Sequence, residues 1–522
     1  MKLRWLYSES DKSFIDQILI NRNKTKYDYQ KKLEDAPNEF LLRDLEIAID
    51  RILHAMYHNE RIVIFGHDDP DGVTATYLLY DFFNYSGYQN HFYYIPNRLV
   101  DHHGIQDSFV EYLKIKNADL LITVDNGISS KDKVEEIKAL GIDVIITDHH
   151  LFDQANIPLA TAVINPKRED CSYPYDMLAG VGVSLMLVKG IAKKLDKEMK
   201  PSYYFWTAVG SLADRVPMAH VNWIVVRHVL DYWDDINDNT INMLKSFCSP
   251  IVSNFDKMNF LTYSYRMIAN GRELEGKHHG LQFILANDKE KYDEFTLIQT
   301  EKKANEQNLF ALNTIIAEIL ADYDGKGVIY FDQESRIPSP LLGTCATFLV
   351  NTLYEPVIML KERDDIIICE GRCSVGFSIL EAFKYCEEAL IQFGGHVKAG
   401  GFTMYKENLP KFIKLYREYF EQEKTHIEEN KTIDIDAVID INELDNDAID
   451  KLDFMLPFGQ DNQEPMLLVK NFDLSGNHHR LLFDNGIKNE LIYGKSYELV
   501  VQINNNGQAK VIDYRESDEN SN

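Results

Sequence analysis

Three short polar stretches made of aspartate, histidine and asparagine follow directly on apolar runs. His67, Asp69 and Asp71 lie in HDDPDG after RIVIFG, and Asp125 lies in DNG after LLITV. The third stretch, DHH at 148–150, follows DVIIT. Such Val/Ile/Leu runs are typical of buried strands, and parallel strands gather their carboxyl ends at one edge of a sheet. We therefore expect these side chains to converge in space.

Carboxylates and imidazoles gathered in this way suit the hydrolysis of phosphate esters by two divalent ions. Such ions lie roughly 3.5 to 4 Å apart, hold the attacking and leaving oxygens, and activate water near neutral pH. Several Asp with one or two His favour manganese or magnesium over zinc, which prefers thiolate and imidazole. Asp214, in GSLADRVPM, adds another carboxylate, and Gly72 gives HxDxDG room to turn.

Each stretch taken alone has a simpler interpretation. A single aspartate or histidine in a loop is usually a helix cap or a solvated side chain. DxDG alone could also form a calcium-like turn. The repetition of such stretches at the strand ends of one predicted sheet favours a metal site instead.

A second DHH stretch occurs earlier in the chain, as DHHG at 101–104. It follows IPNRLV and lies several residues past the end of its strand, whereas the DHH at 148–150 ends its strand with no intervening loop. We therefore assign the site to 148–150. The earlier copy is interpreted as a loop whose Arg98 and His103 lie near substrate or face solvent.

The apolar runs also predict the fold around them. The pattern is helical up to about residue 60, and runs at 61–66, 91–96, 120–125 and 143–148 then alternate with helix-length segments. This alternation predicts βαβ units and a parallel sheet covered on both faces.

Further along, a stretch without Pro or Gly from about 286 to 323 predicts one long connecting helix. A second α/β region begins at GKGVIYFD, and the charged stretch at 421–436 is interpreted as a linker before several short strands. We expect an α/β protein with two parallel-sheet lobes joined by the helix, plus a small C-terminal β-barrel. The predicted divisions are 1–285, 286–325, 326–425, 426–515 and a disordered tail, 516–522.

Composition limits the classes of function. The hydrophobic fraction is 45%, the charged fraction 26% and the formal net charge −27. A nucleic-acid site would need a local basic groove or bound divalent ions, because phosphate binding depends on Lys and Arg. No apolar run approaches the roughly 18 residues of a membrane span, the first residues lack an apolar signal core, and the six cysteines form no CxxC pair. We expect a cytoplasmic protein that has reduced cysteines and does not contact membranes.

The order of these motifs resembles that of the DHH phosphoesterase superfamily and, within it, of the RecJ-type single-strand-specific exonucleases. HDDPDGVTATYLL, TVDNGIS, ITDHH and GSLADRVP are similar to the four DHH motifs, and AGVGVSLML to a RecJ segment. In the second lobe, GRCSVGF and FGGHVKAGGF resemble the DHH-associated domain, whose GGH motif binds substrate phosphate. LPFGQDNQEP resembles the segment before the oligonucleotide-binding (OB) barrel of RecJ, so the resemblance implies an OB-like C-terminal domain.

The resemblance implies two divalent ions, manganese or magnesium, and a role for each ligand. The implied arrangement has one ion held by His67 and Asp71, the other by Asp69, His149 and Asp214, and a bridge formed by Asp125.

Further roles follow from the same resemblance. His150 would approach the scissile phosphate, and Asp148 would orient its neighbours. His67 stands where bacterial RecJ proteins usually have Asp, and an imidazole ligates equally well. The implied substrate-binding residues are Arg272, Arg372, Gly394, Gly395 and His396.

The C-terminal β region is shorter than the usual barrel of this family. Its aromatic residues have two interpretations, because they could stack on bases or pack in the core of a small barrel. They are Phe472, Phe483, Tyr493 and Tyr497.

Three functions fit these motifs. The first is a metal-dependent exonuclease that hydrolyses single-stranded DNA, in preference to RNA, from 5′ to 3′ and releases 5′-mononucleotides. Such an enzyme would act in DNA repair and recombination, with a single-strand-binding protein or a helicase as partner. The second is a small-substrate DHH phosphodiesterase acting on short oligoribonucleotides, cyclic dinucleotides or nucleotide bisphosphates. The third is a non-catalytic DHH scaffold in a replication assembly, which would have no need to retain so many mutually repelling ligands.

Overall fold

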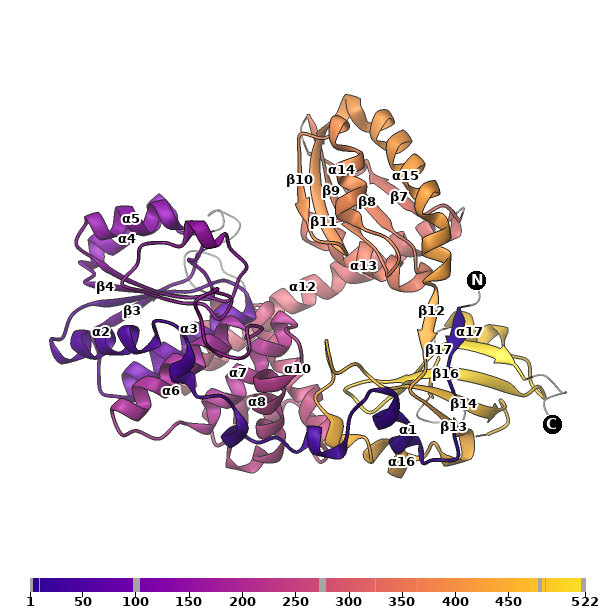
Figure 1. The fold of residues 1–522 in the computed structure, drawn as a ribbon, viewed down its shortest axis with the longest axis horizontal. Helices are drawn as coiled ribbons and strands as arrows, with labels where there is room; N and C mark the ends of the chain where they lie inside the picture. Colours follow the sequence, from indigo (N-terminus) through magenta and orange to yellow (C-terminus); the bar gives the residue numbers. More distant parts are fainter. Residues whose placement is uncertain are drawn as a thin grey trace. The chain divides into compact units, whose positions relative to one another are not determined.

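The computed structural model describes residues 3–8, 10–96, 104–271, 278–323, 325–363, 365–476, 481–483 and 485–517. The chain forms two compact units (Figure 1). The smaller unit comprises Met1–Tyr7 and Lys303–Ile435, and the larger unit comprises Ser8–Lys302 and Asp436–Asn522. Among the described residues, no helix combines the length and the apolar character needed to cross a lipid bilayer.

The larger unit contains a five-stranded sheet in the order β3-β2-β4-β5-β6, and all its ladders are parallel. Its strands are β2 (Ile62–Phe65), β3 (His91–Tyr94), β4 (Leu120–Val124), β5 (Asp143–Thr147) and β6 (Ala162–Ile164). The four expected strands are present. We did not expect β6, because its apolar run is only three residues long and ends at Asn165-Pro166.

Helices cover both faces of this sheet, as the apolar strands require. Ile62 and Ile64 of β2 pack into one core with α2 (Leu45–Tyr57), α3 (Pro70–Tyr85) and α6 (Gly180–Lys194). Val63 and Phe65 alternate with them and face α4 (Asp107–Lys116) and α5 (Lys131–Ala139) on the other side (Figure 1). The remaining helices before residue 286 are α1 (Phe14–Asn21), α7 (Pro201–Asp214), α8 (His220–Asp231), α9 (Asn239–Ser246), α10 (Asn254–Ala269) and α11 (His279–Leu285).

A second five-stranded sheet in the larger unit has the order β13-β14-β16-β17-β15. The expected α/β class with a C-terminal β region is confirmed. No ladder among the described residues joins β13 to β15, so the described strands form a mixed sheet consistent with the expected OB-like domain, and its closure into a barrel stays a prediction. Its elements are β13 (Ala437–Asp440), α16 (Asn446–Asp450), β14 (Met466–Phe472), β15 (Leu481–Leu482), α17 (Asn485–Glu490), β16 (Tyr497–Ile503) and β17 (Ala509–Glu516).

The ordered structure extends further at the C-terminal end of this region than we expected. Glu516, the first residue of the predicted tail, ends β17 and forms an ion pair with Lys495, and 518–522 lie outside the described residues.

The C-terminal sheet shares its core with the helices of the first lobe, and the Trp223 indole N–H donates to the carbonyl of Met455 over 3.4 Å. The C-terminal β region is therefore part of the larger unit.

A 34-residue helix, α12 (Asp288–Ala321), leads from the larger unit into the smaller one. The smaller unit has a five-stranded sheet in the order β10-β11-β9-β8-β7. Its elements are β1 (Arg4–Leu6), β7 (Val328–Asp332), α13 (Leu342–Leu353), β8 (Val357–Arg363), β9 (Ile366–Arg372), α14 (Ile379–Tyr385), β10 (Gln392–Gly395), β11 (Ala399–Tyr405), α15 (Leu409–Glu429) and β12 (Thr432–Asp434).

The sheet of the smaller unit is mixed, whereas we expected a parallel one. Among its described residues, only β7 and β8 pair in parallel, and the other three ladders are antiparallel. The physical reason is loop length. Two residues separate β8 from β9 and three separate β10 from β11, and loops this short join only antiparallel strands.

Two segments have a different structure from the one expected. The charged stretch 421–436 is not a linker, because α15 continues to Glu429 and β12 follows. Phe412, Tyr416, Phe420 and Ile427 are buried along one face of α15, and this apolar face holds the charged segment in a helix. Near the N-terminus, β1 is a strand instead of part of a helix, and it pairs in parallel with β12.

A buried ion pair in the smaller unit supports a first prediction. Lys431 and Glu355 lie 2.9 Å apart with side chains only 5% and 2% exposed, and Glu355 also accepts the Gly327 amide. Lys431→Met leaves the Glu355 carboxylate without its buried cation. We expect the unfolding free energy of the smaller unit to fall by about 3–5 kcal/mol.

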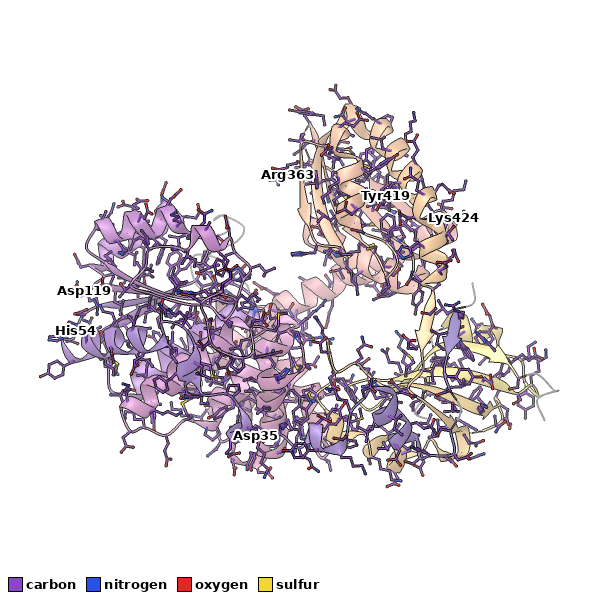
Figure 2. All side chains as sticks on the ribbon, in the orientation of Figure 1. Asp35, His54, Asp119, Arg363, Tyr419 and Lys424 are labelled. Carbon is purple, nitrogen blue, oxygen red and sulfur yellow. The ribbon has the colours of Figure 1, made fainter. Side chains whose placement is uncertain are left out.

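Hydrogen exchange of β8 and β9, measured by mass spectrometry, would report this loss. The matched control is Lys424→Met on α15 (Figure 2), because Lys424 is exposed and lies 3.7 Å from Glu421. That variant should lose less than about 1 kcal/mol. Equal protection in the two variants would contradict the prediction.

Candidate functional site

The carboxyl edge of the parallel sheet brings together the Asp and His residues predicted from the sequence. His67 lies two residues after β2, and Asp125 directly follows β4. The DHH segment at 148–150 directly follows β5. Asp214 arrives from outside the sheet, as the last residue of α7.

The ligand atoms form two groups that meet at Asp125. In the first group, His67 Nδ1 lies 3.0 Å from Asp69 Oδ2 and 3.8 Å from Asp125 Oδ2. In the second, His149 Nε2 lies 3.1 Å from Asp125 Oδ1, 3.8 Å from Asp71 and 3.7 Å from Asp214. Asp125 thus offers one oxygen to each group, as a bridging ligand must.

This grouping differs from the one implied by the family resemblance. We expected His67 with Asp71, and Asp69 with His149 and Asp214. In the structure, the donor atoms of His67, Asp69 and Asp125 lie within 4.8 Å of one another, and so do those of Asp71, His149 and Asp214.

Hydrogen bonds to another helix explain the position of Asp71. Its two carboxylate oxygens accept the backbone amides of Gly180 and Val181, each over 2.8 Å. These amides lie in the first turn of α6, where free N–H groups and the helix dipole favour an anion. They hold the carboxylate beside His149. The AGVGVSLML segment, recognised only as a motif, therefore orients a ligand.

Asp125 is held in an unusual backbone conformation beside the same helix. Its φ is 58°, and its amide donates to the carbonyl of Thr147 on the neighbouring strand over 3.0 Å. A Cβ on Gly180 would lie 2.4 Å from Asp125 Oδ1. Only glycine lets α6 approach the bridging carboxylate this closely.

Asp148 lies beside the two groups and holds their neighbours. Its carboxylate accepts the amides of Ile128, His149 and His150, over 2.7 to 3.0 Å, and lies 2.7 Å from His150 Nδ1. Although burial acts in the opposite direction, these hydrogen bonds leave the pKa of Asp148 below its usual range, and that of His150 is raised. The His150 side chain is 52% exposed, so it can reach a ligand in solvent.

Burial and like charge strongly perturb the acids of the site. Burial and repulsion from Asp71 raise the pKa of Asp125 well above its usual range. Burial and repulsion from Asp214 raise the pKa of Asp71 to about 7, and burial with repulsion from Asp69 raises that of Asp214 to about 6. The cluster therefore favours added positive charge.

The donor set fits divalent ions. Burial lowers the pKa of His149, which keeps its imidazole neutral and able to ligate. Asp125 Oδ1 and His149 Nε2 are buried and make no hydrogen bond within the described part of the chain. Carboxylates mixed with imidazole suit manganese or magnesium.

The sequence interpretation missed two residues that follow β6. Asn165 directly follows this strand, and its side-chain amide donates to the carbonyl of His150 over 3.0 Å. Lys167 donates its ammonium to the carbonyl of His149, and its positive charge lies near Asp148 and Asp214. The polar NPK that follows AVI was the available signal, but the strand itself was too short to recognise.

The predicted phosphate-binding residues of the smaller unit gather at one end of its sheet. Arg372, the last residue of β9, lies opposite Ala399 of β11, and its guanidinium contacts Glu370 over 2.8 Å. His396 lies in the β10–β11 turn, which its amide closes by donating to Ala399. Gly394, Gly395 and His396 are all exposed, and Gly395 has a φ of 137°.

Some predicted residues lie outside the described ones, namely Arg272, Arg98 and the stretch 101–103.

The aromatic residues of the C-terminal sheet divide into two kinds. Phe472 and Tyr497 are buried and pack in the core, whereas Tyr493 is 76% exposed.

Part of the chain that carries this site matches a known protein family. Residues 61–210 match the model of the DHH family, N-terminal domain. The resemblance to DHH phosphoesterases is confirmed. All the ligand residues except Asp214 lie within this DHH segment.

Similarity to RecJ proteins extends well beyond the DHH segment. The chain is 27% identical over 447 residues to the single-stranded-DNA-specific exonuclease RecJ of Bacillus subtilis (strain 168), covering 84% of this chain and 55% of that relative. It is 29% identical over 415 residues to RecJ of Dickeya dadantii (strain 3937), covering 71% and 68%. The chain thus spans about half of the first relative and two thirds of the second.

The fold is also that of a solved RecJ structure. RecJ from Thermus thermophilus in complex with Mn²⁺ superposes with a TM-score of 0.76 at 20% identity, over 97% of this chain and 76% of that one. RecJ from the same organism was also solved with Mg²⁺. The two-lobed α/β fold with a C-terminal β region is therefore shared with RecJ.

The close approach of Gly180 to Asp125 makes a second prediction. Gly180→Ala places a methyl group against the bridging carboxylate, so we expect about 10- to 100-fold weaker Mn²⁺ binding by isothermal titration calorimetry. Gly182→Ala is the matched control on the same helix, because its Cβ would come no closer than 3.5 Å to Leu178. Equal Mn²⁺ affinities in the two variants would refute the role of Gly180.

Repulsion among the acids makes a third prediction. Because the raised pKa values of Asp71 and Asp214 mean that the folded protein binds more protons, the metal-free protein should lose stability as pH rises from about 5 to about 8. Mn²⁺ should therefore raise the melting temperature more at the higher pH. Asp125→Asn, which removes a buried ionisable carboxyl group, should raise the metal-free melting temperature at about pH 8 and abolish most of the Mn²⁺ effect.

Differential scanning fluorimetry with and without EDTA measures both effects. Glu135→Gln, an exposed change on α5, is the control and should behave as the wild type. A metal-free Asp125→Asn protein that melts below the wild type would show that repulsion does not dominate at this site.

Proposed function

We propose that the protein is a metal-dependent exonuclease that hydrolyses single-stranded DNA from 5′ to 3′ and releases 5′-mononucleotides in DNA repair and recombination. The observation that carries the proposal is the pair of ligand groups joined by Asp125. Similarity to RecJ over most of the chain supports single-stranded DNA as the substrate.

The donor atoms suggest which residues would hold each ion. His67, Asp69 and Asp125 would hold one Mn²⁺ or Mg²⁺, and Asp71, His149, Asp214 and Asp125 would hold the other. When bound, two such ions would activate water and stabilise the charge that develops on the scissile phosphate.

The surrounding residues would orient the substrate. His150 is held at Nδ1 by Asp148 and remains half-exposed, so its other nitrogen can donate to a phosphate oxygen. Lys167 adds a positive charge beside His149, which would attract the phosphate and fix the His149 backbone. The first residues of α6 would keep the Asp71 carboxylate in place.

The smaller unit provides groups suited to a longer nucleotide chain. The exposed turn at Gly394-Gly395-His396 leaves the His396 imidazole available to phosphate, and Arg372 ends a neighbouring strand of the same sheet. The family resemblance implies that small-substrate DHH phosphodiesterases tend to consist of the two lobes alone. The long helix α12 and the C-terminal β region of this chain therefore favour a substrate of several nucleotides.

A digestion time course with oligonucleotides of graded length tests the proposal. We expect 5′-labelled single-stranded DNA to lose its label as mononucleotide at once, whereas 3′-labelled DNA should shorten progressively. RNA and duplex DNA of the same sequence should be degraded more slowly. EDTA should stop the reaction, and Mn²⁺ or Mg²⁺ should restore it.

Asp125→Ala identifies the active centre in the same assay. The turnover should fall by more than about 100-fold, since even changes around metal ligands cost about 10- to 100-fold. Glu135→Ala on exposed α5 is the control and should keep full activity. Hydrolysis confined to dimers and trimers would overturn the proposal in favour of a small-substrate phosphodiesterase, and no hydrolysis at all would favour a scaffold.

A further inference from the structure

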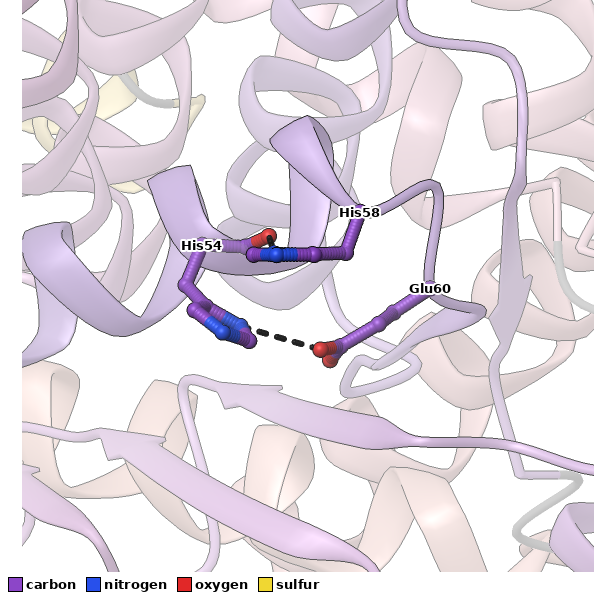
Figure 3. A group of neighbouring side chains, drawn as sticks. All are labelled: His54, His58 and Glu60. Atoms are coloured by element: carbon purple, nitrogen blue, oxygen red, sulfur yellow. Dashed lines mark hydrogen bonds and ion pairs between the residues drawn. The ribbon is translucent and has the colours of Figure 1, made fainter.

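A second group of metal-ligating side chains lies at the opposite edge of the parallel sheet. His54 lies in the last turn of α2, His58 caps this helix, and Glu60 follows two residues later, just before β2 (Figure 3). One donor atom from each lies within 4.8 Å of the others. The imidazole rings of the two histidines are neighbours, with centroids 4.0 Å apart.

Hydrogen bonds already orient these donors. His58 Nδ1 lies 2.9 Å from the carbonyl oxygen of His54, and because a carbonyl only accepts, this nitrogen carries the proton. His58 Nε2 is therefore left with its lone pair for a metal ion. Metal-ligating histidines typically donate their other N–H to a backbone carbonyl in this way.

The carboxylate is oriented by its own partner. Glu60 Oε2 accepts from the Arg51 guanidinium over 2.7 Å, and Arg51 also contacts Asp143 at the beginning of β5 over 2.6 Å. The other oxygen, Oε1, faces His54 Nδ1 at 3.0 Å (Figure 3). The glutamate is thus rigid and mostly buried, whereas the His54 side chain is 55% exposed. An ion from solvent can reach a site whose carboxylate is already in position.

We propose that His54, His58 and Glu60 form a binding site for Zn²⁺. Two histidines four residues apart lie on one face of a helix, which is the spacing that zinc-binding helices use. Two imidazoles and one carboxylate suit zinc, with a fourth position left for water. The several carboxylates that favour manganese or magnesium at the other site are absent from this trio, which has only one.

This zinc site is separate from the catalytic ligands. Glu60 precedes β2 and His67 follows it, so the extended strand places them at opposite edges of the sheet, roughly 20 Å apart. A zinc ion here would tie the end of α2 to the beginning of β2. Its binding should therefore stabilise the larger unit without supplying a group to the reaction.

Isothermal titration of Zn²⁺ into the full-length protein, kept saturated with Mn²⁺, tests the site. The wild type should bind one more Zn²⁺ ion than His54→Gln or His58→Gln. Loss of a direct ligand should weaken Zn²⁺ binding by more than about 100-fold, because changing a residue that only orients a ligand already costs about 10- to 100-fold in affinity. The catalytic ligands are the same in all three proteins, so the difference reports only this site. Circular dichroism melts check that the variants are folded.

His426→Gln provides a matched control. His426 is exposed on α15 and faces Glu423 at 3.6 Å, so it offers a histidine and a glutamate without a second histidine. This variant should bind as many Zn²⁺ ions as the wild type. The proposal is overturned if His54→Gln and His58→Gln keep wild-type stoichiometry and affinity, or if His426→Gln loses an ion as they do.

Discussion

Repulsion between buried carboxylates around Asp125 is the constraint on which the rest of the structure depends. Asp125 lies fully buried at the end of a central strand, with the carboxylates of Asp71 and Asp214 close by. Such a group of like charges cannot remain ionised without positive charge nearby. The protein supplies part of it through the amides of α6 and the ammonium of Lys167, and two divalent ions would supply the rest.

The strand order explains why these charges meet at all. β2, β4 and β5 are neighbours in the parallel sheet, so three loops that are distant in sequence leave the sheet at one edge. Parallel pairing sends their carboxyl ends in the same direction, and helices on both faces keep the strands buried. The amino edge of the same sheet has its own cluster, where Arg51 holds Glu60 near His54.

The smaller unit has a different arrangement, because its predicted phosphate-binding turn, Gly394 to His396, is exposed instead of buried. Its hairpin strands are antiparallel, and they carry Arg372 and the Gly394–His396 turn to one end of the sheet. Glycine at 395 allows a backbone conformation that other residues avoid, which keeps the turn tight and its surface open. The apolar face of α15 covers this sheet although the helix carries a highly charged segment.

The sequence by itself determined the ligand types and their positions at strand ends. Alternation of apolar runs with helices is a local property, and it was sufficient to predict the parallel sheet and to place His67, Asp125 and Asp148 at one edge. It was insufficient for β6, because three apolar residues do not stand out from a loop. It was also insufficient for the mixed sheet of the smaller unit, because strand direction there depends on loops of two and three residues, and apolar runs alone do not show where such loops begin.

Only the tertiary structure decided which ligands share a group. Asp71 lies beside His149 because amides 109 and 110 residues away in sequence hold its carboxylate, and no local pattern encodes such a bond. The contribution of Lys167 likewise depends on a strand that pairs with β5. The residue types of the ligand groups can be read from the sequence. How these residues divide into two groups depends on long-range hydrogen bonds, which form only when α6 packs against the sheet.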